Sequence, residues 1–114
     1  MKTASLIKDL QYNDTKPAIQ VLIDTEACKE IRITFREGQV MKEHKTSFPI
    51  VVEIFEGAID FGVNGTICHL KKGDLVALEG GVPHDLKALE TSTVRLSLNK
   101  ADSTKRVEDV ARNS

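Results

Sequence analysis

The chain has 114 residues and a mass of 12.6 kDa, which is enough for one domain with one hydrophobic core. The 16 Lys and Arg residues nearly balance the 17 Asp and Glu residues, so there is no basic field to bind nucleic acid or an anionic membrane surface. The N-terminal sequence lacks the long apolar stretch and small-residue cleavage site of a secretory signal, so we expect a soluble, cytoplasmic protein.

Residues 1–16 are predicted to form an N-terminal segment that precedes the folded domain. This segment carries the apolar residues Leu6, Ile7 and Leu10, which could lie against the domain or against a partner subunit. The pattern alone leaves both possibilities open. Residues 17–99 alternate short extended segments with turns and hold no lasting 3.6-residue apolar period, so this region is expected to be all β.

Strands are predicted wherever apolar and polar residues alternate. The sequence IRITF at 31–35 has this pattern, and VRLSLN at 94–99 repeats it. Asn64-Gly65 lies between two apolar runs and predicts a two-residue hairpin turn, because such a turn needs positive φ at both positions. Glycine-containing turns on both sides of residues 74–78 predict a further strand there.

The predicted hairpin also assigns structural roles to a histidine and a cysteine. Counting outward from the turn places Asp60 opposite His69, which predicts an exposed ion pair without a functional role. The same register places Phe61 opposite Cys68. Because Cys68 and Cys28 show no C-x-x-C spacing, both are expected to be buried free thiols rather than a redox pair or zinc ligands.

The last segment, residues 100–114, is almost wholly polar. Val107, Val110 and Ala111 lie at helical spacing and could form one short amphipathic turn. We expect a frayed polar tail rather than a docked helix.

Glycines and histidines recur at fixed spacings in the middle of the chain. They form two groups, one that ends at Gly57 and one that begins at Gly73, with 15 residues between these two glycines. The residues are Gly38, His44, Gly57, Gly73, Gly81 and His84. With these residues the sequence resembles the cupin superfamily over about residues 30–98, in particular small single-domain cupins of the RmlC-like type. The resemblance implies an all-β double-stranded β-helix, also called a jelly-roll barrel, built from residues 17–99.

The resemblance also implies a metal site, which this sequence carries only in part. Thr46 stands where the family has its second histidine, Ile50 stands where it has a glutamate, and Glu79 replaces a motif proline. His44 and His84 remain as candidate ligands for a divalent metal (Fe, Mn, Ni or Zn) at low occupancy, completed by water or by the Thr46 hydroxyl. Because loss of even an outer-shell partner typically costs about 10–100-fold in metal affinity, tight metal binding is not expected.

Side chains two positions apart on a strand share a face, which allows a pocket to be predicted around the two histidines. Its expected residues come from both motifs and from the apolar faces of the predicted strands, and they are His44, Thr46, Ile50, Val52, Ile54, His84, Leu86 and Leu96. A barrel cavity of this kind, apolar with a few polar groups, is typical of a small-molecule site.

Three classes of function fit these observations, and the sequence does not decide whether the protein is an enzyme. The first is a small cupin that binds a small molecule near His44 and His84. The second is a metal-dependent cupin enzyme, such as a dioxygenase or isomerase, with a reduced ligand set. The third is a structural or regulatory dimer with a vestigial pocket. Nucleophilic catalysis has no candidate residue, whereas acid–base catalysis by either histidine would need no metal. A homodimer is expected from the resemblance.

Overall fold

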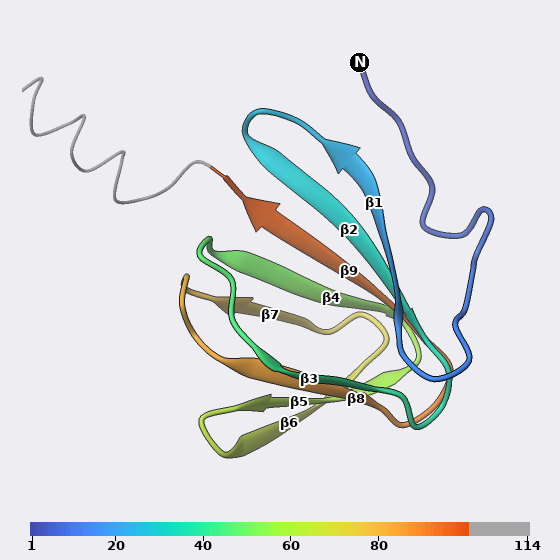
Figure 1. Cartoon of the computed structure of the whole chain (residues 1–114), viewed down its shortest axis with the longest axis vertical. Coiled ribbons are helices and arrows are strands. Elements are labelled where there is room, and N and C mark those ends of the chain that lie inside the picture. Colours follow the sequence, from blue (N-terminus) through green and yellow to red (C-terminus); the bar gives the residue numbers. More distant parts are fainter. Residues whose placement is uncertain (101–114) are drawn as a thin grey trace, which may run out of the picture.

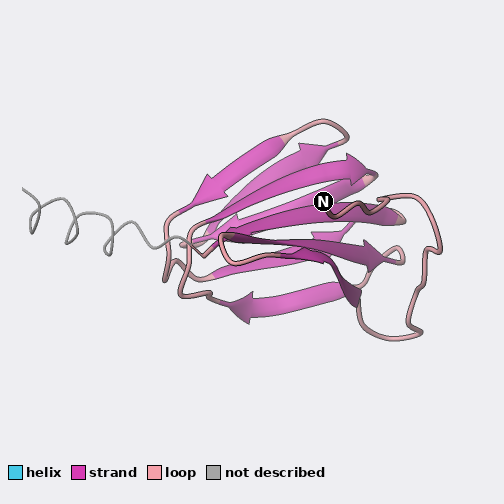
Figure 2. Ribbon diagram, turned by 90° about the horizontal axis from the view of Figure 1, so that it is seen from above, coloured by secondary structure: helices cyan, strands magenta, loops and turns pink. Residues whose placement is uncertain are grey.

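In the computed structural model, which describes residues 1–100, the chain forms β-strands and no helix within that range (Figures 1 and 2). Accordingly, no helix in the described residues could cross a membrane. Residues 101–114, which include Val107, Val110 and Ala111, lie outside the described residues. The strands are β1 (Ala18–Asp24), β2 (Cys28–Phe35), β3 (Val40–His44), β4 (Ile50–Glu56), β5 (Ala58–Val63), β6 (Thr66–Lys71), β7 (Leu75–Leu78), β8 (His84–Ala88) and β9 (Ser92–Asn99).

The strands form two antiparallel sheets that face each other, as Figure 1 shows. The five-stranded sheet has the order β1-β2-β9-β4-β7, and the four-stranded sheet has the order β3-β8-β5-β6. The chain crosses repeatedly from one sheet to the other, for example from β2 to β3 and back to β4. This winding is that of a double-stranded β-helix, so the predicted all-β fold class is confirmed.

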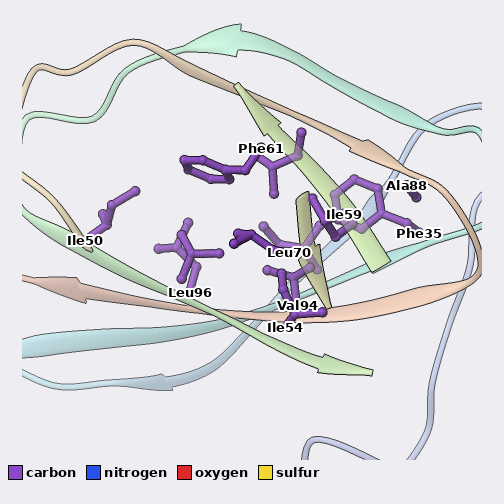
Figure 3. Close-up of a cluster of buried hydrophobic side chains, with 12 residues drawn as sticks. Phe35, Ile50, Ile54, Ile59, Phe61, Leu70, Ala88, Val94 and Leu96 are labelled. Carbon is purple, nitrogen blue, oxygen red and sulfur yellow. The ribbon is translucent and has the colours of Figure 1, made fainter. Parts of the chain in front are cut away.

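The hydrophobic core lies between the two sheets (Figure 3). Strand β4 shows how the sequence builds it, because Ile50, Val52 and Ile54 are buried whereas Val51 between them is exposed. The core residues on both sheets follow the same two-residue alternation, and they are Ile33, Phe35, Ile50, Val52, Ile54, Ile59, Phe61, Leu70, Leu86, Ala88, Val94 and Leu96.

The predicted hairpin between β5 and β6 is confirmed. Asn64 and Gly65 have φ values of 52° and 76°, and Val63 pairs with Thr66 across the turn. The register then places Asp60 opposite His69, and the Asp60 carboxylate accepts a hydrogen bond from Nδ1 of His69. This pair lies at the surface, as the hairpin register predicts.

The predicted burial of the two cysteines is wrong. Cys68 pairs with Phe61 and points to the same side of the sheet, but its side chain is exposed. The reason is its position on β6, which is an edge strand of the four-stranded sheet and lacks a neighbour on one side. Cys28 begins β2 at the end of the other sheet and is only half-buried.

The N-terminal segment is held against β2 by a buried arginine. Arg32 is 2% exposed, and its guanidinium donates hydrogen bonds to the backbone carbonyls of Ser5, Lys8 and Asp9. The side chain of Gln20 accepts a further hydrogen bond from Arg32. Of the three apolar residues singled out in this segment, Leu6 is half-buried, whereas Ile7 and Leu10 are exposed, which leaves these two available for a contact outside the described chain.

Candidate functional site

The two motif histidines lie side by side in the four-stranded sheet. His44 ends β3 and His84 begins β8, and the antiparallel register of these strands pairs the two residues. Their ring centroids are 4.4 Å apart, and the rings meet edge to face at 61°. Residues that are 40 positions apart in the sequence are thus brought together at one end of the sandwich.

Two crossover loops fix the positions of these histidines. The loop after His44 and the loop before His84 are joined where the backbone N–H of Gly81 donates to the carbonyl of Thr46 at 2.7 Å. Gly80 packs so closely that an added Cβ would lie 2.5 Å from the Ser47 carbonyl oxygen. Gly81 has a φ of 81°, a conformation that glycine adopts without strain. Gly80 and the motif glycine Gly81 therefore hold together the two loops that flank the imidazoles.

Backbone hydrogen bonds determine which ring nitrogen carries the proton. Nδ1 of His84 lies 2.9 Å from the Val82 carbonyl, and Nδ1 of His44 lies 2.8 Å from the Lys42 carbonyl. A carbonyl oxygen can only accept, so each Nδ1 must be the donor. In a neutral ring this leaves Nε2 without a hydrogen and with a lone pair. Both imidazoles can therefore act as acceptors or as ligands through Nε2.

His84 is a buried and unsatisfied member of this pair. Its side chain is 1% exposed, and its Nε2 has no hydrogen-bond partner among residues 1–100. Burial lowers the pKa of His84 below its ordinary value of 6.5, and the neighbouring His44 lowers it further. The hydrogen bond to Val82 and the charge of Asp85 act in the opposite direction but are weaker than the burial effect. His84 is therefore favoured as a neutral imidazole at neutral pH.

Phe61 completes the surroundings of His84 and was not predicted as a site residue. The two rings are stacked, with centroids 5.6 Å apart and planes 12° apart. Phe61 lies on β5, which neighbours β8 in the same sheet. The alternation of Phe61 with Ile59 in the sequence indicated that both lie on the buried face of β5. The contact with His84 depends on the register between β5 and β8, which pairs Val63 with His84.

The other predicted pocket residues divide into two groups. Thr46 lies in the loop after β3, where its hydroxyl donates to the carbonyl of Phe48 at 2.8 Å. The apolar members are packed in the hydrophobic core with exposures of 0–7%, and they are Ile50, Val52, Ile54, Leu86 and Leu96. The structure thus brings His44 and His84 into ring contact, whereas the five apolar residues are part of the packed core between the sheets.

The donor groups present do not fit the four-ligand metal centre that the sequence resemblance implies. Two histidine nitrogens are available, but Thr46 offers only a neutral hydroxyl oxygen in place of an imidazole, and Ile50 offers no ligand atom in place of a carboxylate. Within residues 1–100 there is no group of three or more His, Cys, Asp and Glu residues arranged to hold a metal ion. Two imidazoles can at most contribute to a weak divalent site, because closed protein sites commonly use more ligands.

The two facing sheets and the winding of the chain between them define a small jelly-roll fold. No protein-family model matches the sequence, and no curated protein matches it significantly. Solved structures match it well: an RmlC-like cupin from Desulfovibrio desulfuricans has a TM-score of 0.80 at 20% identity, covering 87% of this chain and 96% of that one. This chain therefore has the fold of the RmlC-like cupins.

Two further solved structures with this fold carry functional names. KdgF from a Halomonas species has a TM-score of 0.72 at 19% identity, covering 87% of this chain and 95% of that one. Salicylate 1,2-dioxygenase from Pseudoaminobacter salicylatoxidans, solved with gentisate, has a TM-score of 0.69 at 20% identity. That match covers 73% of this chain but only 25% of the dioxygenase. At these identities the likeness establishes the fold and leaves the activity to be argued from the site.

Proposed function

We propose that this protein binds a small organic molecule at the His44–His84 pair, and that the ligand donates a hydrogen bond to Nε2 of His84. The observation that carries the proposal is the buried Nε2 without a partner in the described chain. Leaving a buried polar atom unpaired costs about 1–3 kcal/mol, so a donor that reaches it gains that amount in binding. A hydroxyl or N–H group of a ligand meets this need.

The surroundings of His84 favour a ligand that is small and partly apolar. Phe61 is stacked on one side of the imidazole, and core residues such as Leu86 lie on the same strand as His84. Such surfaces contact hydrocarbon or aromatic groups, while one or two polar groups set the orientation. The solved salicylate 1,2-dioxygenase, a quarter of which matches this chain, was determined as an adduct with gentisate, a small hydroxylated aromatic compound, and this likeness supports the choice of ligand class.

Matched compounds with and without donors test the proposal. Catechol and other small hydroxylated compounds should raise the melting temperature of the wild-type protein and shift the imidazole resonances of His84. Their methyl ethers have similar shapes but no O–H donor. A loss of about 1–3 kcal/mol corresponds to binding that is about 5- to 100-fold weaker. The measurements are thermal shift assays and NMR titrations.

Two variants provide the controls for this experiment. His84→Leu removes the acceptor while keeping an apolar side chain, and it should abolish the difference between each compound and its ether. His69→Ala alters the exposed histidine of the β5–β6 hairpin and should leave binding unchanged. Equal binding of compounds and ethers, or full binding by the His84→Leu protein, would contradict the proposal. Pairing with a second copy of the chain, with Leu6, Ile7 and Leu10 as the candidate contact residues, stays a prediction that light scattering can check.

A further inference from the structure

A cavity lies at one end of the five-stranded sheet, and neither His44 nor His84 lines it. The cavity has a volume of about 520 Å³ and is formed where β2 and β4 begin and where β7 and β9 end. Its volume falls within the range of about 300–1,000 Å³ that is typical of small-molecule sites. The cavity is therefore large enough to hold a small organic molecule.

The lining of this cavity is apolar and acidic. Seven of its twelve residues are Ala, Val, Leu, Ile or Pro, including Val51 and Leu78, so the lining suits an apolar body. The lining carries the carboxyl groups of Glu30 and Glu79, and among residues 1–100 no Lys, Arg or His residue belongs to it. A cation is therefore favoured over an anion at this position.

Glu30 has one carboxylate oxygen left for a ligand. Its side chain is 18% exposed, and the hydrogen bonds that it accepts within residues 1–100 all go to Oε1. They come from Nε of Arg95 at 2.9 Å and from the Ser97 hydroxyl at 2.6 Å. Arg95 also contacts Glu53 at 3.5 Å, so one guanidinium is shared between two carboxylates. The Glu30–Arg95–Glu53 group thus keeps a net negative charge, to which Glu79 adds.

We propose that this cavity, which neither His44 nor His84 lines, is a binding site for a small organic cation with a primary ammonium group and a short alkyl or aryl body. The ammonium group contacts Oε2 of Glu30 or the carboxylate of Glu79, and the body lies against the apolar lining. Charge-assisted hydrogen bonds of this type are about twice as strong as neutral ones. A neutral alcohol of similar shape can donate a hydrogen bond but carries no positive charge, and the corresponding carboxylate is repelled by Glu30 and Glu79.

The two free cysteines allow a direct test in the full-length protein. Cys28 lines the cavity and is half-buried, whereas Cys68 is exposed on the opposite sheet and serves as an internal control. The rate at which N-ethylmaleimide modifies each thiol is followed by mass spectrometry with increasing hexylammonium, hexanol or hexanoate. Hexylammonium should slow modification of Cys28 at a concentration at least about tenfold lower than hexanol, leaving Cys68 unaffected.

Substitutions at the carboxylates separate charge recognition from simple apolar contact. Glu79→Gln and Glu30→Gln should each raise the half-protecting concentration of hexylammonium several-fold. Glu79→Gln keeps the test decisive if loss of the Arg95 contact disturbs folding of the Glu30→Gln protein. Glu90→Gln removes an exposed carboxylate away from the cavity and should have no effect.

Four results would overturn the inference. Equal protection by hexanol or hexanoate would show that the carboxylates do not recognise the cation. No protection by hexylammonium would show that the cavity does not take this class of ligand. Protection of Cys28 that depends on protein concentration would assign the cavity to a second copy of the chain. Protection that disappears only when residues 101–114 are removed would assign it to these C-terminal residues.

Discussion

Replacing Gly57 by alanine should lower the free energy of unfolding by about 3 kcal/mol, measured by chemical denaturation. Gly57 joins β4 to β5 with a φ of 95°, a conformation that costs side chains about 1–2 kcal/mol. An added Cβ would also lie 2.1 Å from the hydroxyl oxygen of Ser92 and 2.7 Å from its Cα. Because Ser92 is buried and its hydroxyl accepts from the Ala58 N–H, the clash cannot be relieved by a simple rotation.

Gly73 provides the matched control for this prediction. It has nearly the same φ of 92°, but an added Cβ would meet no atom within 4 Å. Gly73→Ala should therefore lose only the conformational term, about 1 kcal/mol. Equal losses in the two proteins would show that the close packing between Gly57 and Ser92 is absent.

Replacing Arg32 by methionine should cost about 2–3 kcal/mol of stability and release the N-terminal segment. The guanidinium is buried and bonds the carbonyls of Ser5, Lys8 and Asp9. Hydrogen bonds to charged groups contribute about 1.5–3 kcal/mol each before the cost of burying the charge is subtracted. Hydrogen exchange should show faster exchange in residues 1–16 of the variant than in the wild-type protein.

Arg36→Met is the control for this second prediction. Arg36 contacts the same segment through the Asn13 carbonyl at 3.3 Å, but it is exposed. Its loss should change stability by no more than about 0.5 kcal/mol, which is usual for a surface substitution. Unchanged exchange in residues 1–16 of the Arg32→Met protein would contradict the role given to Arg32.

The sequence was most informative where a local pattern determined the structure. The two-residue alternation predicted the buried face of β4, and Asn64-Gly65 predicted the hairpin turn together with the pairing of Asp60 and His69. These features depend on positions close in sequence. The motif glycines also indicated the fold. A turn whose backbone has a positive φ, such as the turn at Gly57, favours glycine at that position, so the spacing of the glycines marks the turns between strands.

Predictions that depended on the arrangement of the sheets were less successful. Cys68 shares the inner face with Phe61, but its exposure depends on β6 being an edge strand. The contact between Phe61 and His84 follows from the order β8-β5 in the sheet, which no local pattern reveals. The cavity beside Glu30 was missed for the same reason, since its lining comes from the ends of several strands.

The pH dependence of His84 follows from the same burial. Because the folded-state pKa is lower than the ordinary value of 6.5, the unfolded chain binds a proton more readily than the folded protein. The contribution of His84 to stability is therefore fully present above pH 6.5 and is lost as the pH falls through this value towards the lower folded pKa. His84→Leu should make the unfolding free energy less sensitive to pH in this window.

Nitrogen-15 NMR of the histidine side chains tests most directly whether His84 is a buried neutral imidazole with a free Nε2. The structure predicts a neutral ring at pH 7 that carries its hydrogen on Nδ1, titrates below pH 6.5, and changes its Nε2 resonance when a donor ligand is added. A His84 ring that carries its hydrogen on Nε2, or one that is charged at pH 7, would contradict the account.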